Sequence, residues 1–284
     1  RPLSAQELQD YHVNERINDR GVLVDVDLCR AAVKYASTEL AEIQAIVAEV
    51  TGGEITSVRS PKMRQWVYER VGEEARKLMQ KDGKVSIDKT VRANLLNCDG
   101  VPPDVQEVIQ CADDLWASSV AKFSRLAQLA DEEDGRVRGA FVFAGGSATG
   151  RASSYGAQVH NFTRACAESP NDVRTAMVRG HAIVPKFGPR VTDVLRGMLR
   201  PALIPAPGKV LVVADWAAIE ARVNPWLSNC KSGEEKLALF ATGADVYKVN
   251  ASATFHVPVE SVDKAQRQIG KVQELACGFA GGVG

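Results

Sequence analysis

The first third of the chain has apolar residues at the spacing of amphipathic helices. Residues 28–50 contain no Gly or Pro, and Leu40, Ile43 and Val47 recur three or four positions apart. Thr51-Gly52-Gly53 then gives a stop signal. The pattern predicts one long helix over 28–50.

Three more helices are predicted before residue 131. Ser60-Pro61 puts a proline in the first turn of one helix, where its missing N–H costs nothing. Ser86-Ile87-Asp88 can open a short second one. Pro102-Pro103 leads into an amphipathic pattern over 105–130, which predicts a single long helix. The polar stretch 72–84 carries no predicted element.

The character of the sequence changes after the acidic run 131–135. Residues 136–144 predict a strand, and the wholly apolar run 210–214 predicts a strand buried on both faces. We therefore expect an α/β (α+β) protein with two domains, a helical module over 1–135 and an α/β module over 136–284. Further helices are predicted over 190–200, 217–228, 233–241, 245–254 and 260–278.

Composition narrows the class. Over 284 residues, 45% are hydrophobic and 25% charged, which excludes disordered and collagen-like chains. No apolar run approaches the ~18 residues of a membrane span. There is no signal-peptide pattern and no initial Met, so we expect the sequence to start within a longer protein. The six Cys form no C-x-x-C pair, which favours reduced thiols in the cytoplasm.

Charge is uneven although the chain is neutral overall. Residues 136–200 contain ten Lys or Arg and three Asp or Glu, whereas residues 1–135 carry an acidic excess. A basic segment of this kind can bind a polyanion such as nucleic acid, or it can be a solvated face. Charge alone leaves both possibilities open.

Asp215 follows the predicted buried strand and precedes a helix. Carboxylates at strand ends are where α/β sheets place metals and ligands, and Mg²⁺ needs few protein ligands. Two-metal phosphoryl transfer requires another carboxylate nearby. The alternative is that Asp215 caps the following helix.

The last predicted helix places two cations one turn apart. Arg267, Lys271 and Leu275 lie at i, i+4 and i+8, with Phe279 one step further. This face suits a nucleoside triphosphate, with phosphates at Arg267 and Lys271. The alternative is an ordinary amphipathic helix with surface charges.

A glycine-rich run, 145–152, nearly matches a phosphate-binding P-loop. That motif needs Lys followed by Ser or Thr, and Arg151-Ala152 stands there instead. The residues that follow do not read as the expected helix start, so the P-loop interpretation is not favoured.

Four segments together, in this order, resemble the family A DNA polymerases, especially those of bacteriophages. Thr149-Gly150-Arg151 with Ser153-Ser154 and Gln158 to Asn161 resembles the T-G-R-x-S-S … Q-N stretch at the template–primer. Asp215 to Arg222 resembles the first palm motif. Gly243 to Tyr247 resembles a fingers segment, and Arg267 to Phe279 the nucleotide-binding fingers helix. The helices before 135 resemble the thumb.

The resemblance implies a fold and a reaction. The fold would be a helical thumb-like module over 1–135, followed by a partial palm with mostly helical fingers. The reaction would be template-directed DNA synthesis, a nucleotidyl transfer in DNA replication that uses two Mg²⁺ ions. Template–primer DNA and deoxynucleoside triphosphates would be the partners, without a membrane; processivity or replisome proteins are left open. The location would be the cytoplasm, that of the host if the source is a phage.

The resemblance also implies roles for single residues. Asp215, with the Trp216 carbonyl, would bind the metal ions, and Lys271 would act in catalysis beside Arg267 at the triphosphate. Glu220 would crowd the sugar 2′ position. The remaining assignments are Tyr247 at the phosphates, Leu275 and Phe279 at sugar and base, and Arg151, His160, Asn161 and Arg164 at the DNA.

Departures from the family pattern keep alternatives open. Ala217 and Ala218 replace polar residues, Phe279 lacks a hydroxyl, and no His-Asp pair supplies the second metal carboxylate. We therefore expect an incomplete polymerase that is inactive alone. The alternatives are a non-catalytic DNA-binding protein built on polymerase remnants and a relative of single-subunit RNA polymerases. Glu220 argues against the latter, because it would exclude a ribose hydroxyl.

Overall fold

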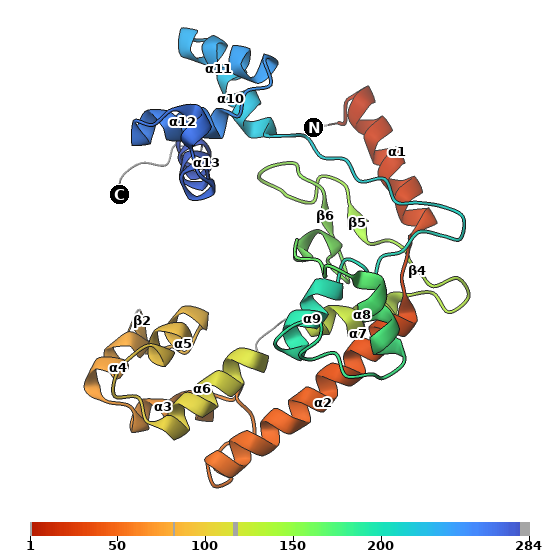
Figure 1. Ribbon diagram of the computed structural model, residues 1–284. Coiled ribbons are helices and arrows are strands. Elements are labelled where there is room, and N and C mark those ends of the chain that lie inside the picture. Colours follow the sequence, from red (N-terminus) through yellow and green to blue (C-terminus); the bar gives the residue numbers. More distant parts are fainter. Residues whose placement is uncertain (1, 82, 116–118, 279–284) are drawn as a thin grey trace. The chain divides into compact units, whose positions relative to one another are not determined.

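The computed structural model describes residues 2–81, 83–115 and 119–278, and the side chains of 119 and 120 are not described. The chain forms two compact units, residues 1–211 and residues 212–284. Figure 1 shows both as predominantly helical, with only short strands. The helix-rich fold class expected from the sequence is therefore confirmed.

The 1–211 unit is organised by one long helix. This helix, α2 (Val26–Val50), begins at the capping residue Asp25 and contributes to two separate apolar cores. The other helices of the unit are α1 (Ala5–Arg20), α3 (Pro61–Arg70), α4 (Glu73–Met79), α5 (Lys89–Leu96), α6 (Pro103–Leu115), α7 (Ser119–Leu129), the 3₁₀ turn η1 (Val159–Asn161), α8 (Pro170–Val178) and α9 (Val191–Met198).

The two cores divide α2 between them. Its second half packs Ile43 and Val47 against α3 to α6, in what we call the α3–α6 core. Its first half packs Leu28 and Ala32 against α7, α8 and α9, in what we call the α7–α9 core. One helix thus ties both cores into a single unit.

In the described part of the unit there are three antiparallel strand pairs, and each strand is two residues long. They are β1 (Val22–Leu23) with β4 (Arg136–Val137), β2 (Gln80–Lys81) with β3 (Lys84–Val85), and β5 (Phe141–Val142) with β6 (Ser153–Ser154). Val22 lies opposite Val137, and Phe141 opposite Ser154. These pairs fix loops and do not form a sheet layer.

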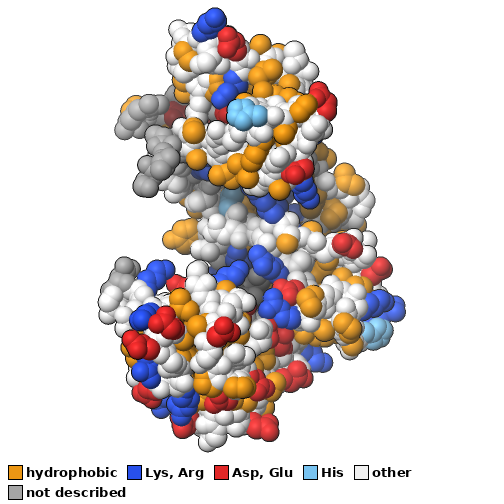
Figure 2. All heavy atoms as spheres, turned by 60° about the vertical axis from the view of Figure 1, so that its left-hand side comes forward, with side chains coloured by type: hydrophobic (Ala, Val, Ile, Leu, Met, Phe, Trp, Pro, Cys, Tyr) orange, Lys and Arg blue, Asp and Glu red, His pale blue; other side chains and the backbone are white. Residues whose placement is uncertain are grey.

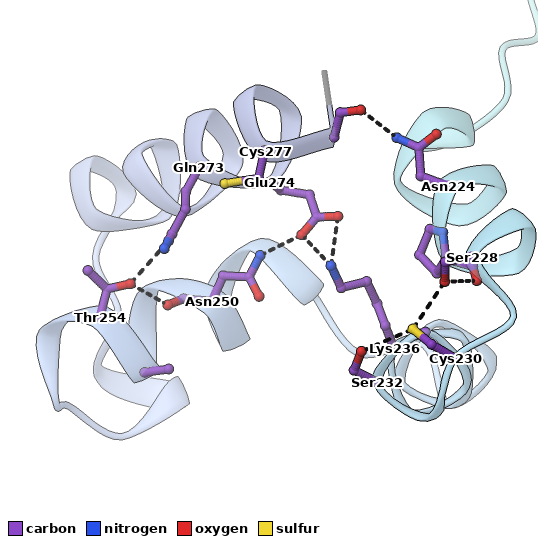
Figure 3. A pocket seen from close by; sticks show the side chains of 14 residues that line it. Asn224, Ser228, Cys230, Ser232, Lys236, Asn250, Thr254, Gln273, Glu274 and Cys277 are labelled. Atoms are coloured by element: carbon purple, nitrogen blue, oxygen red, sulfur yellow. Dashed lines mark hydrogen bonds and ion pairs between the residues drawn. The ribbon is translucent and has the colours of Figure 1, made fainter. Parts of the chain in front are cut away.

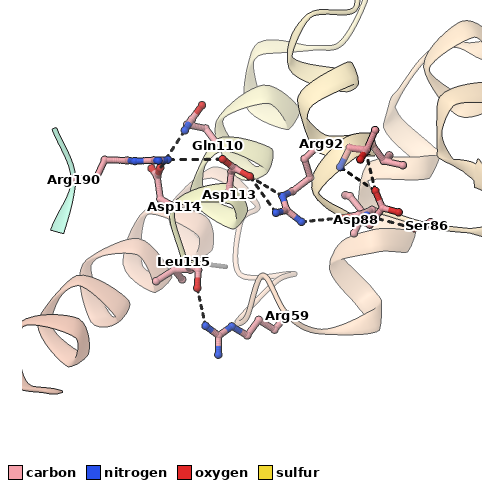
Figure 4. A network of polar contacts seen from close by, with 12 residues as sticks. Arg59, Ser86, Asp88, Arg92, Gln110, Asp113, Asp114, Leu115 and Arg190 are labelled. Carbon is pink, nitrogen blue, oxygen red and sulfur yellow. Dashed lines mark hydrogen bonds and ion pairs between the residues drawn. The ribbon is translucent and has the colours of Figure 1, made fainter. Parts of the chain in front are cut away.

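A polar network joins the helices of the α3–α6 core to the α7–α9 core (Figure 4). Arg92 of α5, 2% exposed, forms an ion pair with Asp113 of α6 at 3.1 Å. Arg190, just before α9, pairs with Asp114 of α6 at 2.8 Å and with Asp193 at 2.7 Å. The charge of the buried Arg92 guanidinium is thus paired with the Asp113 carboxylate, and burial of a charge in an apolar interior is costly without such a partner.

The 212–284 unit contains α10 (Ile219–Ser228), α11 (Lys231–Ala241), α12 (Val246–Phe255), η2 (Val259–Ser261) and α13 (Lys264–Gly278). Few of its described side chains are buried, and in Figure 2 apolar side chains are spread over its surface at the top of the view. None of the described helices of the protein is both long enough and apolar enough to cross a membrane.

Most helices predicted from the sequence are confirmed; the helix predicted over 105–130 corresponds to α6 and α7, and residues 116–118 between them lie outside the described residues. Three expectations need correction. The stretch 72–84, for which no element was predicted, contains α4, β2 and the start of β3. The strand expected over 136–144 is interrupted at Gly139, whose φ of +63° suits glycine, so β4 and β5 pair with different partners. Residues 210–214 form no strand.

The apolar run 210–214 is exposed rather than buried, and Val213 is 90% accessible. A strand buried on both faces requires paired neighbours, and within the described residues no strand pairs with this run. The local pattern was correct for an extended segment but could not supply its partners. The break between units also falls later than residue 135; the proposed division there into thumb-like and palm–fingers modules stays a prediction.

Candidate functional site

Asp215 lies in the exposed extended segment that leads into α10. Trp216, next to it, is 81% exposed. The chain turns at Ala218, which adopts a left-handed conformation with φ of +51°, and α10 begins at Ile219. Asp215 therefore does not cap α10. Its carboxylate and the Trp216 carbonyl offer two oxygen donors.

Glu220 lies in the first turn of α10 and is half-buried. Two contacts of Arg222, in the same helix, fix its first turn. Arg222 donates from Nε to the Ala217 carbonyl at 3.0 Å, and its guanidinium carbon lies 4.2 Å from the ring centroid of Phe240 in α11. Asp215 therefore precedes this turn, and Glu220 lies in the helix that follows it.

The cationic face of α13 is formed as predicted. Arg267, Lys271 and Leu275 are all half-buried, at successive turns of one helix. Phe279, the fourth member of the predicted set, lies outside the described residues. Tyr247 of α12 flanks the first cation, with the Arg267 guanidinium carbon 5.3 Å from its ring centroid.

Arg267 is held by a residue that the sequence did not single out as part of the site. Its Nε donates to Asp245 Oδ2 at 2.6 Å. Asp245 Oδ1 meanwhile accepts from the backbone N–H groups of Tyr247 and Lys248 and so caps α12. Asp245 is the first residue of the helix predicted over 245–254 and is a typical capping residue, but its ion pair spans 22 residues and no local pattern shows it.

The pKa of Asp245 reflects these contacts. Partial burial raises it, but the hydrogen bonds from Arg267 and from the Lys248 and Tyr247 amides lower it by more, so the pKa lies below its ordinary value. The carboxylate is therefore charged at neutral pH, and the ion pair is formed.

Gly270 lets α13 lie close against α12. A Cβ at Gly270 would lie 2.2 Å from the Tyr247 carbonyl oxygen and 3.0 Å from the Ala251 amide nitrogen. Because both are backbone atoms, they cannot move aside as a flexible side chain can. The close approach brings the start of α12 next to the face of α13 that carries Arg267.

A cavity of about 590 Å³ lies elsewhere in the same unit (Figure 3). Glu274, with a side chain 8% exposed, accepts from Lys236 at 2.9 Å and from Asn250 at 2.8 Å there. Hydrogen bonds with Ser228 and Ser232 lower the pKa of the Cys230 thiol on its rim to about 7. None of the predicted nucleotide-binding residues that the structure describes lines this cavity.

The four predicted DNA-binding residues all lie in the 1–211 unit and are exposed. Arg151 belongs to the loop between β5 and β6, which closes through a hydrogen bond from Gly146 N to Arg151 O at 2.9 Å. His160 and Asn161 belong to η1, where the Asn161 carbonyl accepts from Lys122 at 2.7 Å. Arg164 follows shortly after. The glycine-rich loop is followed by β6 rather than a helix, so it is not a P-loop.

Comparisons with known proteins agree on one family. The family model described as DNA polymerase family A matches residues 26–279. The chain belongs to DNA polymerase family A. The resemblance to family A that the sequence motifs indicated is thereby confirmed.

The relatives of this family A chain are longer. A DNA polymerase of Bacillus phage SP02 is 33% identical over 96% of this chain and 40% of its own length. The thermostable DNA polymerase I of Thermus aquaticus is 27% identical over 95% of this chain and 28% of its own. The chain thus spans two fifths or less of these relatives.

A solved structure shows the same fold. The POL domain of Pol1 from M. smegmatis, in complex with DNA primer-template and dNTP, superposes with a TM-score of 0.59. The match covers 91% of this chain and 39% of that one, at 20% identity. This identity supports the fold and carries no assignment of single residues.

Proposed function

We propose that this chain is the nucleotide-binding part of a DNA-directed DNA polymerase, which adds deoxynucleotides to a primer 3′ end. The observation that carries the proposal is the α12–α13 arrangement. Arg267 and Lys271 lie one turn apart on α13, and Tyr247 flanks Arg267. Two cations at this spacing suit a triphosphate, which carries several negative charges along a short chain.

The proposed roles follow the positions of the side chains. Lys271 neutralises the phosphate charge that develops as the primer hydroxyl attacks, while Arg267 binds the triphosphate. Leu275, one turn beyond Lys271, contacts sugar and base; Phe279 is proposed for the same contact. Glu220 crowds the sugar 2′ position, so a ribonucleotide is disfavoured.

The metal chemistry proposed is that of two Mg²⁺ ions. The carboxylate of Asp215 and the carbonyl of Trp216 are the oxygen donors that Mg²⁺ prefers, and they fit one side of such a site. Bound Mg²⁺ would stabilise the charge on the transferred phosphate. Within the described residues no three His, Cys, Asp or Glu side chains form a ligand cluster. The second metal carboxylate is proposed to come from outside the described residues.

The proposed partner of the 1–211 unit is template–primer DNA. Arg151, His160, Asn161 and Arg164 are exposed, and contacts of such side chains to the sugar–phosphate backbone position a duplex without reading its sequence. The affinity of this unit for DNA should therefore fall with rising salt, because each neutralised phosphate releases counterions.

One observation favours a second candidate. One metal-binding carboxylate, Asp215, is proposed among the described residues, and a chain with one such ligand suits DNA binding without catalysis. We expect purified 1–284 not to extend a primer in Mg²⁺. Template-dependent extension by this chain would contradict that expectation and show that one carboxylate suffices.

The test of the proposed function is equilibrium binding of a deoxynucleoside triphosphate to chain 1–284 with primer–template. Lys271→Ala should weaken binding about tenfold, as expected for loss of a charge-assisted contact. Lys231→Ala, which removes an exposed lysine at the start of α11, should leave binding unchanged. Equal binding by all three chains would show that the cations of α13 are ordinary surface charges without a role in nucleotide binding.

A sugar comparison separates DNA from RNA synthesis. The wild-type chain should bind a deoxynucleotide more tightly than the matched ribonucleotide. Glu220→Ala should reduce the difference between the two dissociation constants. Glu235→Ala, on exposed α11 surface, is the control. Equal wild-type affinity for both sugars would favour the relative of single-subunit RNA polymerases.

A further inference from the structure

The guanidinium of Arg267 is engaged on one edge only. Its Nε donates to Asp245 Oδ2 at 2.6 Å, and within the described part of the chain its two terminal nitrogens make no hydrogen bond. The side chain is 39% exposed. The two terminal amino groups, which form the fork that matches phosphate oxygens, are therefore available to a ligand.

Asp245 can hold this arginine firmly because its two oxygens have separate tasks. Oδ1 accepts from the Tyr247 and Lys248 amides at 3.1 and 3.2 Å, which fixes the carboxylate to the first turn of α12. Oδ2 is then presented to Arg267 in a defined direction. Tyr247 adds a second restraint, since its ring lies beside the same guanidinium.

We propose that Asp245 is a positioning residue for nucleotide binding, which orients Arg267 so that its terminal amino groups meet the triphosphate. The inference rests on the proposed function of α13. A free arginine side chain loses rotamer freedom when it is fixed. Asp245 fixes it before the nucleotide arrives, so less affinity is lost on binding.

A purely structural role is the alternative, because the same ion pair ties α12 to α13. The two roles differ in their dependence on the ligand. A positioning residue affects ligands that carry the distal phosphates and acts only through Arg267. A structural residue affects all ligands and also acts when Arg267 is absent.

The decisive variant is Asp245→Asn. Asparagine is as good a helix cap as aspartate, so α12 keeps its first turn. Its single oxygen is then occupied, and its amide N–H₂ cannot accept from Arg267 Nε. Asp263→Asn is the matched control, because Asp263 Oδ1 caps α13 through Gln266 N at 2.8 Å and its side chain forms no ion pair with another described residue.

The measurement is the dissociation constant of a deoxynucleoside triphosphate and of the matching monophosphate, for chain 1–284 with primer–template. Asp245→Asn should weaken triphosphate binding about tenfold, the size of one charge-assisted contact, and leave the monophosphate unchanged. Asp263→Asn should change neither. In an Arg267→Ala background, Asp245→Asn should have no further effect, because coupled residues are not additive.

The outcomes separate this inference from the proposed function. If Arg267→Ala weakens triphosphate binding but Asp245→Asn leaves it unchanged, tightens it, or weakens it equally in the Arg267→Ala background, Asp245 does not position Arg267. If Arg267→Ala and Lys271→Ala both leave binding unchanged, the proposed function of α13 fails and the inference fails with it. A ¹⁵N spectrum checks the contact itself: the Arg267 Nε–H signal should be slow to exchange in wild type and fast in Asp245→Asn.

Discussion

The two units of the chain differ in the interactions that stabilise each of them. In the 1–211 unit, large side chains such as Phe123, Leu126 and Met198 are fully buried in continuous cores. In the 212–284 unit the buried apolar residues are small, among them Ala221 and Ala251, while Trp226 is 66% exposed. Among its described residues, close helix contact at Gly270 and partly buried ion pairs such as Lys236–Glu274 supplement the few buried apolar side chains. Binding residues on such a unit can be rearranged at lower cost than on a packed one.

The largest effect is expected in the α7–α9 core. Phe123→Ala should lower the free energy of unfolding of the 1–211 unit by about 3–5 kcal/mol, the usual loss for a buried aromatic side chain. Trp226→Ala, a change of similar size on α10, should cost under about 0.5 kcal/mol because the side chain is mostly exposed. Denaturant titration of chain 1–284 followed by circular dichroism checks both. Equal losses would show that the units do not differ in packing.

The next effect tests the buried ion pair of the 212–284 unit. Glu274→Ala leaves Lys236 and Asn250 without their acceptor and should destabilise α11–α13 by about 2–3 kcal/mol, somewhat less than for a fully buried pair. Glu274→Gln keeps an acceptor oxygen and should lose less. Hydrogen exchange of the α11–α13 amides reports the loss directly. Unchanged exchange in Glu274→Ala would mean that the pair contributes nothing to the unit.

Helices were predictable from the sequence because their signals are local. The end of α2 at Thr51 and the caps at Ser60 and Asp88 could be identified from neighbouring residues. The exposed course of residues 210–214 could not be predicted, because whether an extended run is buried depends on partners elsewhere. Helices α4 and α8 were missed: α4 lies in the polar stretch 72–84, and α8 is a helix of only nine residues.

The candidate site divides in the same way. The spacing of Arg267, Lys271 and Leu275 placed them on one helix face, and the structure agrees. The partner of Arg267 was beyond the reach of spacing, because Asp245 reaches it only through the packing of α12 on α13. Local pattern thus identified the residues facing the proposed ligand, while tertiary contacts determine how they are held.

A smaller effect tests the close helix contact. Gly270→Ala should cost about 1–3 kcal/mol, because its Cβ meets backbone atoms of α12 and the helices must separate. Gly278→Ala is the matched control at the other end of α13, where the Cβ meets only the movable Asn224 side chain. The thermal unfolding temperature and the nucleotide affinity should both fall in Gly270→Ala and stay unchanged in Gly278→Ala. If both variants behave alike, close contact at Gly270 is not what holds the unit.

The smallest effect lies in the packed unit, where one carboxylate of α2 opposes folding. Burial raises the pKa of Glu39 to about 7, and the negative charges of Asp114 and Glu42 add to this while Arg190 opposes it. Between pH ~4.5 and ~7 the native state holds a proton that the unfolded state has released, so stability falls as pH rises through this window.

Glu39→Gln should remove this loss of stability. Its advantage over wild type should be absent at pH 4 and reach about 1 kcal/mol at pH 8, a value reduced for solvent screening of a half-exposed group. Urea unfolding across this pH range measures it, with Glu49→Gln on the same helix as the control. An advantage that is independent of pH would show that the gain has a cause other than the charge of Glu39.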